Sequence, residues 1–536
     1  MPSSWDAVVV GAGPNGLVAA NRLLDAGWSV LVLEAQPEVG GAVASARDVH
    51  PDFVHDTFSA FYPLAASSPT IASFDLEKHG LVWRHAPSVL GHPLPDGSWA
   101  VLHRDRHETA TGLDALHPGD GEAWLEMCSQ WDRVGPHLVG SLLTPFPPVR
   151  HGAAMVAALR HVGGLDFVKT MLTPAGELTR KRFGGEAARV LVAGNAAHAD
   201  IPLDAPGSGM IGMLLSMLGQ TVGFPVPQGG AGELTQAMAR RFLAGGGEIR
   251  TNAEVTRIDV SHRRVTGVRT ADGELYLVGR AVIADVLATT LYTQLVEPSE
   301  LPPSLRDALT SFELDPGTVK VDWALDGTIP WTGAPALPAG TVHIADSVAD
   351  MTLAMSQVHA GAVPAAPFML TGQMTTSDPG RSPAGTESFW AYAHVPQHTV
   401  SDAGDGQIRG VWDHDDCERF ADRMQARLER LAPGFGSRVL ARRVLGPREM
   451  QARNANLVGG ALNGGTAQLH QQLVFRPMPG LGRAETPIRG LFLGSASAHP
   501  GGGVHGACGD NAARAALWHA RAGKFLPRAA RGALGR

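Results

Sequence analysis

Hydrophobic and polar positions along the first forty residues follow the order of a strand, a helix and a second strand. The apolar run 7–10 has the length of a buried parallel strand, and residues 29–33 form a second run of the same kind. Gly27 stands between them where a helix commonly ends in the left-handed conformation. This order predicts a βαβ unit at the start of the chain.

A glycine-rich turn joins the first strand to the helix. Residues 11–16 read Gly-Ala-Gly-Pro-Asn-Gly, in which the first glycine permits a tight turn, the second lets the backbone approach a pyrophosphate and the third lets helix and strand pack closely. The helix N-terminus offers unpaired N–H groups to the anion, and an acid after the second strand is placed to bind ribose hydroxyls. The predicted dinucleotide contacts are Gly11, Gly13, Pro14, Asn15, Gly16, Glu34 and Ala35.

The residues that follow decide between the dinucleotides. A carboxylate at Glu34 would repel a 2′-phosphate, which favours FAD or NAD over NADP. The pair Gly40-Gly41, just past this acid, resembles the second fingerprint of the glutathione-reductase-like FAD proteins. We therefore expect FAD.

The rest of the hydrophobic pattern predicts a helical block followed by two groups of strands. Residues 67–223 are helical in pattern and weakly charged, with amphipathic helices expected over 122–138 and 153–172. A block this long predicts an inserted domain. Strands are expected at 248–250, 253–260, 264–271, 274–278, 281–285, 320–325 and 389–394, with a hairpin turn at Asp272-Gly273 and a helix over 417–431.

Residues 205–232 carry no charged side chain. Their glycines and prolines and the lack of basic flanks argue against a membrane-spanning helix. The interpretations that stay open are a buried helix, the wall of an apolar tunnel, or a segment that contacts a membrane surface without crossing it.

Length, charge and cysteine content limit the class of protein. A chain of 536 residues predicts at least two domains, and its net charge of -7 argues against nucleic acid as a partner. Cys128, Cys417 and Cys508 form no Cys-x-x-Cys, which excludes a redox dithiol and fits a reducing compartment. The first strand lies so near Met1 that no signal peptide is expected, so we predict a cytoplasmic protein, with association to a membrane left open.

Four blocks of the sequence resemble one family. They are the N-terminal fingerprint, PVPQGGAGEL at 225–234, NLVGGALNGG at 456–465 with Phe475-Arg476-Pro477, and AHPGGGVHGACGDNAAR at 498–514. Together they are similar to the phytoene desaturase-like branch of the FAD-dependent amine oxidase and carotenoid desaturase superfamily. Within it they resemble bacterial relatives of pyridine nucleotide-disulphide oxidoreductase domain-containing protein 2.

The resemblance implies an α/β fold with a glutathione-reductase-like Rossmann FAD-binding domain, made of residues 1–66, 224–300 and 448–536, and a discontinuous α+β substrate-binding domain, made of 67–223 and 301–447. Carried over by position, Gly40 and Gly41 would meet the central phosphates and Val255 the adenine. Residues 502–504 would lie against the isoalloxazine ring, namely Gly502, Gly503 and Val504. Ser495 and Ser497 stand where glycines are common, and Ser495 is counted among the expected FAD contacts.

Flavin chemistry needs few protein side chains, because the cofactor itself accepts hydride from a substrate C–H. A helix N-terminus behind Gly506 can stabilise the reduced flavin. If a base is required, the candidates are His505, His499, His55 and Asp56. No metal site is expected, since His103 and His107 lack a third ligand.

These observations predict an FAD-dependent dehydrogenase or desaturase that takes hydride from an apolar small molecule, isoprenoid or polyene-like, and is reoxidised by oxygen or a quinone. Three alternatives stay open. They are a saturase or isomerase using reduced flavin, an oxidase of a smaller substrate, and a non-catalytic flavoprotein that binds lipid or a partner.

Overall fold

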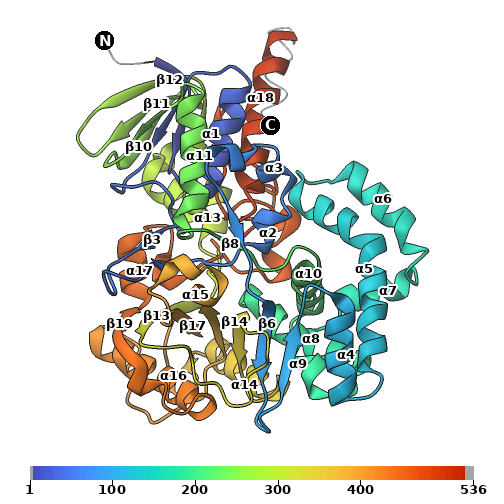
Figure 1. Cartoon of the computed structure of the whole chain (residues 1–536). Coiled ribbons are helices and arrows are strands. Elements are labelled where there is room, and N and C mark those ends of the chain that lie inside the picture. Colours follow the sequence, from blue (N-terminus) through green and yellow to red (C-terminus); the bar gives the residue numbers. More distant parts are fainter. Residues whose placement is uncertain (1–3, 526–536) are drawn as a thin grey trace.

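Two large β-sheets, one above the other in Figure 1, organise the chain, which the computed structural model describes over residues 4–525. The first sheet is built from N-terminal, central and C-terminal segments in the strand order β10-β11-β12-β1-β2-β9, with β20 paired to β12. Its strands are β1 (Ser4–Val10), β2 (Val30–Leu33), β9 (Glu248–Arg250), β10 (Val255–Ser261), β11 (Arg264–Thr270), β12 (Leu275–Ala284) and β20 (Leu491–Leu493).

Five of these strands run parallel, namely β1, β2, β9, β12 and β20, and their carboxyl ends lie at one edge of the sheet. β1 pairs with β2 and β12, and β12 pairs with β20, all in parallel register. The residues that follow Val10, Leu33, Ala284 and Leu493 are therefore brought together, as expected for a sheet that binds a ligand at its carboxyl edge. Three helices pack against this sheet: α1 (Pro14–Asp25), α11 (Gly232–Ala244) and α18 (Ala507–Phe525).

One expectation about this sheet was wrong. Residues 274–278 and 281–285 do not form two strands, because β12 runs without interruption from the Asp272-Gly273 hairpin into the parallel core. The register between β1 and β12 shifts by one residue between Trp5 and Ala7, and β12 pairs with β11 at its start and with β20 at its end.

The second sheet is mainly antiparallel, in the order β19-β13-β17-β16-β14-β6-β7. Its strands are β6 (Ser88–Pro93), β7 (Trp99–Leu102), β13 (Gly317–Leu325), β14 (Ala339–Ile344), β16 (Met369–Gln373), β17 (Glu387–Val395) and β19 (Val439–Leu445). Alternate residues of β13 and β17, including Val321 and Phe389, pack with helix α16 (His414–Leu431). The residues between them, such as Lys320 and Tyr392, occupy the opposite face.

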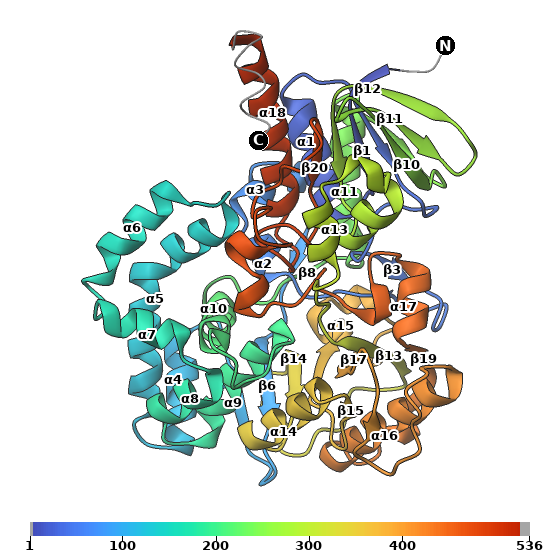
Figure 2. The same ribbon diagram turned by 180° about the vertical axis from the view of Figure 1, so that it is seen from behind.

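Residues 67–223 are mostly helical, as expected, but they also contain strands β6 and β7 at the edge of the second sheet. The helices are α4 (Arg106–Leu116), α5 (Asp120–Leu143), α6 (Val149–Leu159), α7 (Leu165–Leu172), α8 (Ala175–Arg182), α9 (Glu186–Ala196) and α10 (Ser208–Thr221). The single helix expected over 153–172 is divided into α6 and α7 by Gly163 and Gly164, both at positive φ. α6 and α7 project sideways from the two sheets (Figures 1 and 2).

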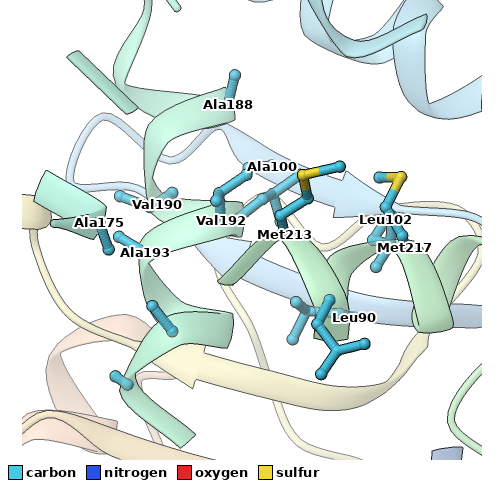
Figure 3. Close-up of a cluster of buried hydrophobic side chains, with 14 of the residues drawn as sticks. Leu90, Ala100, Leu102, Ala175, Ala188, Val190, Val192, Ala193, Met213 and Met217 are labelled. Carbon is cyan, nitrogen blue, oxygen red and sulfur yellow. The ribbon is translucent and has the colours of Figure 1, made fainter. Parts of the chain in front are cut away.

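The uncharged segment 205–232 forms α10, which is largely buried against α9. Met213 and Met217 lie in a cluster with Leu90 and Leu102 of the second sheet (Figure 3). This placement confirms the buried helix. None of the helices over residues 4–525 is long and apolar enough to cross a membrane.

Candidate flavin site

The glycine-rich turn at 11–16 is a cradle that side chains would fill. A Cβ on Gly16 would lie 2.1 Å from the carbonyl oxygen of Gly11, and one on Gly13 would lie 2.9 Å from a carboxylate oxygen of Asp285. Gly11 itself is at φ +96°, a conformation that other residues rarely adopt. The turn therefore requires glycine at these positions, and it places the N-terminus of α1 where an anionic ligand can bind.

Glu34 is held in place by backbone donors at the end of β2. The Ala12 N–H donates to Oε2 at 2.7 Å and the Gln36 N–H donates to Oε1 at 2.9 Å. The side chain of Asn15 is also buried in this region, and its Oδ1 accepts no hydrogen bond from the residues between 4 and 525. A fixed carboxylate and an unsatisfied amide oxygen are both hydrogen-bond acceptors, which fits the hydroxyl groups of FAD.

The other expected contacts lie around the same edge. Gly41 packs on Gly13, since a Cβ there would lie 3.1 Å from its Cα. Val255 begins β10, two residues after Ala253, whose N–H donates to the carbonyl of Glu34 at 2.8 Å. This bond places the predicted adenine contact beside the predicted ribose contact.

The C-terminal turn 495–505 is fixed by a buried arginine. The Arg476 guanidinium donates to the carbonyls of Asn463 (2.7 Å), Thr466 (2.9 Å) and Ala496 (2.7 and 3.0 Å). Burial lowers its pKa to about 10. Asn463 in turn lies against Gly502, whose Cβ would meet its Oδ1 at 2.3 Å. The loop 456–465 and the expected flavin-facing turn are thus joined, in agreement with an anchoring role for Arg476.

The two histidines of this turn differ in their surroundings. His505 is buried, and its Nδ1 accepts the Ala507 N–H at 3.0 Å, which caps helix α18. Burial lowers its pKa to about 4, so the ring is neutral near pH 7. His499 contacts the Thr144 carbonyl through Nε2 at 3.2 Å and lines a cavity of about 230 Å³ with Phe146.

His55 and Asp56 form strand β4 (His55–Asp56) and are completely buried. Asp56 accepts from Arg381 Nη1 at 2.9 Å and from the Ala231 N–H at 2.7 Å, while His55 Nε2 lies 3.0 Å from the Trp323 carbonyl. These contacts tie the segment after the first sheet to the second sheet. They give both residues a structural role at the junction of the two sheets.

Some residues that the sequence analysis did not select also belong to this region. Asp285 follows β12, and its Oδ2 accepts the Gly16 N–H at 2.8 Å. The signal that could have found it is an acid at the end of an apolar strand. Lys320 on β13 donates to the Asp56 carbonyl at 2.9 Å and pairs with Asp322, but no sequence pattern brings these segments together.

The comparisons with known proteins agree with this site. Residues 9–74 match the model of an NAD(P)-binding Rossmann-like domain, and residues 167–324 match that of flavin containing amine oxidoreductase. The mouse pyridine nucleotide-disulfide oxidoreductase domain-containing protein 2 is 27% identical over 95% of this chain and 92% of its own length. A phytoene desaturase (neurosporene-forming) of Rhodobacter capsulatus is 23% identical over 94% of this chain and 92% of its own.

Solved structures share the fold across nearly the whole chain. A putrescine oxidase superposes with a TM-score of 0.60 at 17% identity, covering 97% of this chain and 99% of its own. An oxidoreductase from Methanosarcina mazei gives a TM-score of 0.59 at 14% identity, with 96% and 99% covered. The glutathione-reductase-like Rossmann fold with a second α+β part is confirmed.

The fold, the cradle and these relatives define the chain as an FAD-dependent oxidoreductase. It is similar to the flavin-containing amine oxidases and to the phytoene desaturases. When bound, FAD supplies a hydride acceptor. Gly11, Gly13, Gly16 and Glu34 would bind and orient it, and Arg476 holds the C-terminal turn 495–505 in place.

Proposed function

We propose that the protein is a dehydrogenase or desaturase that removes hydride from a CH–CH group of an apolar, isoprenoid or polyene-like molecule. The observation that carries the proposal is the contact between Leu64 and Gly503. A Cβ on Gly503 would meet Leu64 Cδ1 at 2.8 Å, so an apolar side chain covers the turn assigned to the flavin ring.

The surface around Leu64 is apolar and aromatic. Leu64, Phe61 and Tyr392 are each partly accessible and pack against the same apolar cluster, which includes Trp390. Phe61 lies 6.1 Å from Trp390, and Trp390 stacks on Tyr392 at 5.9 Å between ring centroids. A surface of this kind favours hydrocarbon over charged substrates.

Named relatives support the same substrate class. Full-length relatives include phytoene desaturases and one of the subunits of a limonene dehydrogenase from Castellaniella defragrans, which is 23% identical over 95% of this chain. Reoxidation by oxygen or a quinone completes the proposed cycle.

The projecting arm formed by α6 and α7 supports contact with a membrane that holds such a substrate. α6 has no buried residue, and the exposed fractions of Val149, Val156 and Leu165 are 73, 70 and 84%. Residues 144–172 carry Arg150, Arg160 and Lys169 against Asp166, a net charge of about +2 when histidine is counted as neutral. Exposed apolar side chains flanked by basic ones fit an anionic bilayer surface.

The test is anaerobic titration of the FAD-loaded protein with apolar donors in vesicles, a polyene and a monoterpene, and with a diamine. Loss of the oxidised flavin absorption on adding an apolar donor is the expected result. Reduction by the diamine alone would replace the proposal with an amine oxidase, and reduction by no donor would favour a binding role.

Two matched variants locate the substrate surface. Leu64→Asn places a polar group against Gly503 and is expected to slow reduction at least tenfold, while FAD content stays unchanged. Leu172→Asn makes the same change at a side chain that is 53% exposed on the projecting arm, and leaves reduction by a donor dissolved in detergent as in the wild type. Equal rates for both variants would contradict the assignment of Leu64.

A further inference from the structure

Asp200 and His394 meet deep inside the molecule, although 193 positions separate them in the sequence. Asp200 follows a short 3-10 helix after α9, and His394 lies on the inward face of β17, next to Tyr392. The Asp200 Oδ1 lies 2.6 Å from the His394 Nε2, and the two side chains are 2 and 9% exposed.

The two facing atoms of this pair are close together and buried. Although Oδ1 and Nε2 are close, neither atom has a well-aligned hydrogen bond to any residue between 4 and 525. Both side chains line a cavity of about 20 Å³ that also touches the exposed side chain of His359. Since one water needs roughly 10–15 Å³, the cavity admits a single water between the buried pair and the surface.

The surroundings favour a charged pair. Burial opposes the charge on His394, but the carboxylate of Asp200 outweighs it and raises the pKa of His394. The Asp315 carboxylate accepts the Leu462 N–H. Burial and the nearby Asp200 raise the pKa of Asp315 to about 6. The titratable groups that face the pair from adjoining elements are Asp315, His198, His359 and Tyr392.

One side chain connects the pair to the flavin-facing turn. The Asn463 Nδ2 donates to Asp200 Oδ2 at 2.5 Å, and the same Asn463 lies directly against Gly502. The loop that holds Asn463 is fixed by Arg476 and by three backbone N–H groups that donate to Asp315. Asp200 is therefore held at a fixed position one side chain away from Gly502.

We propose that Asp200 and His394 form the acid–base pair of the reaction, and that the cavity at His359 connects the pair to solvent. This acid–base role rests on the function proposed above, the removal of hydride from a CH–CH group. One substrate C–H bond breaks with its electron pair leaving as hydride, which reduces the flavin by two electrons. The neighbouring C–H bond breaks in the opposite sense: its electron pair forms the C=C bond, and its proton passes to Asp200 Oδ1. His394 then releases a proton to water in the cavity and takes up the proton from Asp200 in its place, which restores the charged pair.

The first experiment measures anaerobic flavin reduction in Asp200→Asn and His394→Gln, using the donor that reduces the wild type. The expected loss is about 10² to 10⁴-fold in rate at unchanged FAD content, because general base catalysis contributes that range. The wild-type rate is expected to rise with pH and level off, and the rates of both variants to be independent of pH. Asp204→Asn and His398→Gln are matched controls at exposed positions four residues away in sequence.

A second experiment needs no substrate. The reduction potential of the bound FAD is measured against pH by equilibration with redox dyes in the same five proteins. The wild type and both controls are expected to show a change of slope where the pair titrates, and Asp200→Asn and His394→Gln to lose it. A change of slope retained in all five proteins overturns the proposal. If Asp200→Asn and His394→Gln lose the change of slope but no tested donor reduces the flavin, the result supports the Asp200–His394 pair and contradicts the proposed substrate.

Discussion

The carboxylate of Asp285 accepts the backbone N–H of Gly16 at 2.8 Å, across 269 positions of sequence. This bond joins the end of β12 to the first turn of α1, at the edge where the cofactor's pyrophosphate is expected. Asp285 is buried, and burial together with the nearby Glu34 charge raises its pKa from 3.8 to about 7. A carboxyl group at the anion-binding turn is therefore ready to take up a proton near neutral pH.

Asp285→Asn is predicted to stabilise the FAD-free protein at pH 8 but not at pH 4. Because the folded state binds the Asp285 proton more tightly than the unfolded chain, the group lowers stability progressively as pH rises from about 4 to about 7. Three pKa units at about 1.4 kcal/mol each give an upper limit of about 4 kcal/mol. Urea denaturation of both proteins at the two pH values measures the difference.

The same variant separates this effect from cofactor binding. FAD affinity of the wild type is expected to fall above pH 7, as Asp285 becomes charged beside the pyrophosphate site, and affinity of the variant is expected to change less. Parallel pH dependence in the two proteins would show that Asp285 does not titrate in this range.

Gly16→Ala is predicted to abolish FAD binding. Its Cβ would lie 2.1 Å from the Gly11 carbonyl oxygen, so the turn must open and its N–H groups must move. The control is Gly112→Ala in α4, where a Cβ meets nothing within 4 Å. The Gly112→Ala protein is expected to keep FAD, and its free energy of unfolding is expected to rise by roughly 0.5–1 kcal/mol, because alanine is the better helix residue. FAD content after desalting and the urea midpoint report the two outcomes.

The local part of the site could be predicted from the sequence, and the part made by distant segments could not. Gly11 to Glu34 is one continuous βαβ unit, so spacing alone indicates its fold and its ligand. Strand β6 was missed although it forms a local hairpin with β7; its other neighbour, β14, lies about 250 residues further on. The interruption expected near Gly279 was also wrong: β12 pairs with β1 on both sides of that glycine, where the register shifts by one residue, and the strand continues.

The same limit applies to the chemistry. The pair formed by Asp200 and His394 depends on how residues after α9 fold over β17, and neither neighbourhood carries a motif. His505, by contrast, was selected because it lies beside the flavin-facing turn in the sequence. In the structure its Nδ1 caps the N-terminus of helix α18. The position of His505 in the sequence predicted that it lies near the cofactor. It did not indicate that its Nδ1 already accepts the Ala507 N–H.

Arg476→Lys is predicted to destabilise the protein by at least about 3 kcal/mol and to release FAD. A lysine ammonium cannot match the planar fork that reaches the carbonyls of Asn463, Thr466 and Ala496 together, and unsatisfied buried groups each cost about 1–3 kcal/mol. Limited proteolysis within residues 456–465 and FAD content measure the result. Arg483→Lys, at a side chain that is 62% exposed, should leave both unchanged.

His505→Asn is predicted to keep FAD and to keep the wild-type rate of flavin reduction, whereas His505→Ala is predicted to lose about 1–3 kcal/mol of stability. The asparagine Oδ1 can take the place of Nδ1 as acceptor for the Ala507 N–H, and alanine leaves that buried N–H without a partner. Since burial lowers the His505 pKa to about 4, neither variant should alter the pH profile of reduction between pH 6 and 9. Stopped-flow reduction and urea denaturation of both variants test this. A rate for His505→Asn that falls 100-fold at normal stability would return His505 to the role of base, and it would remove that role from Asp200.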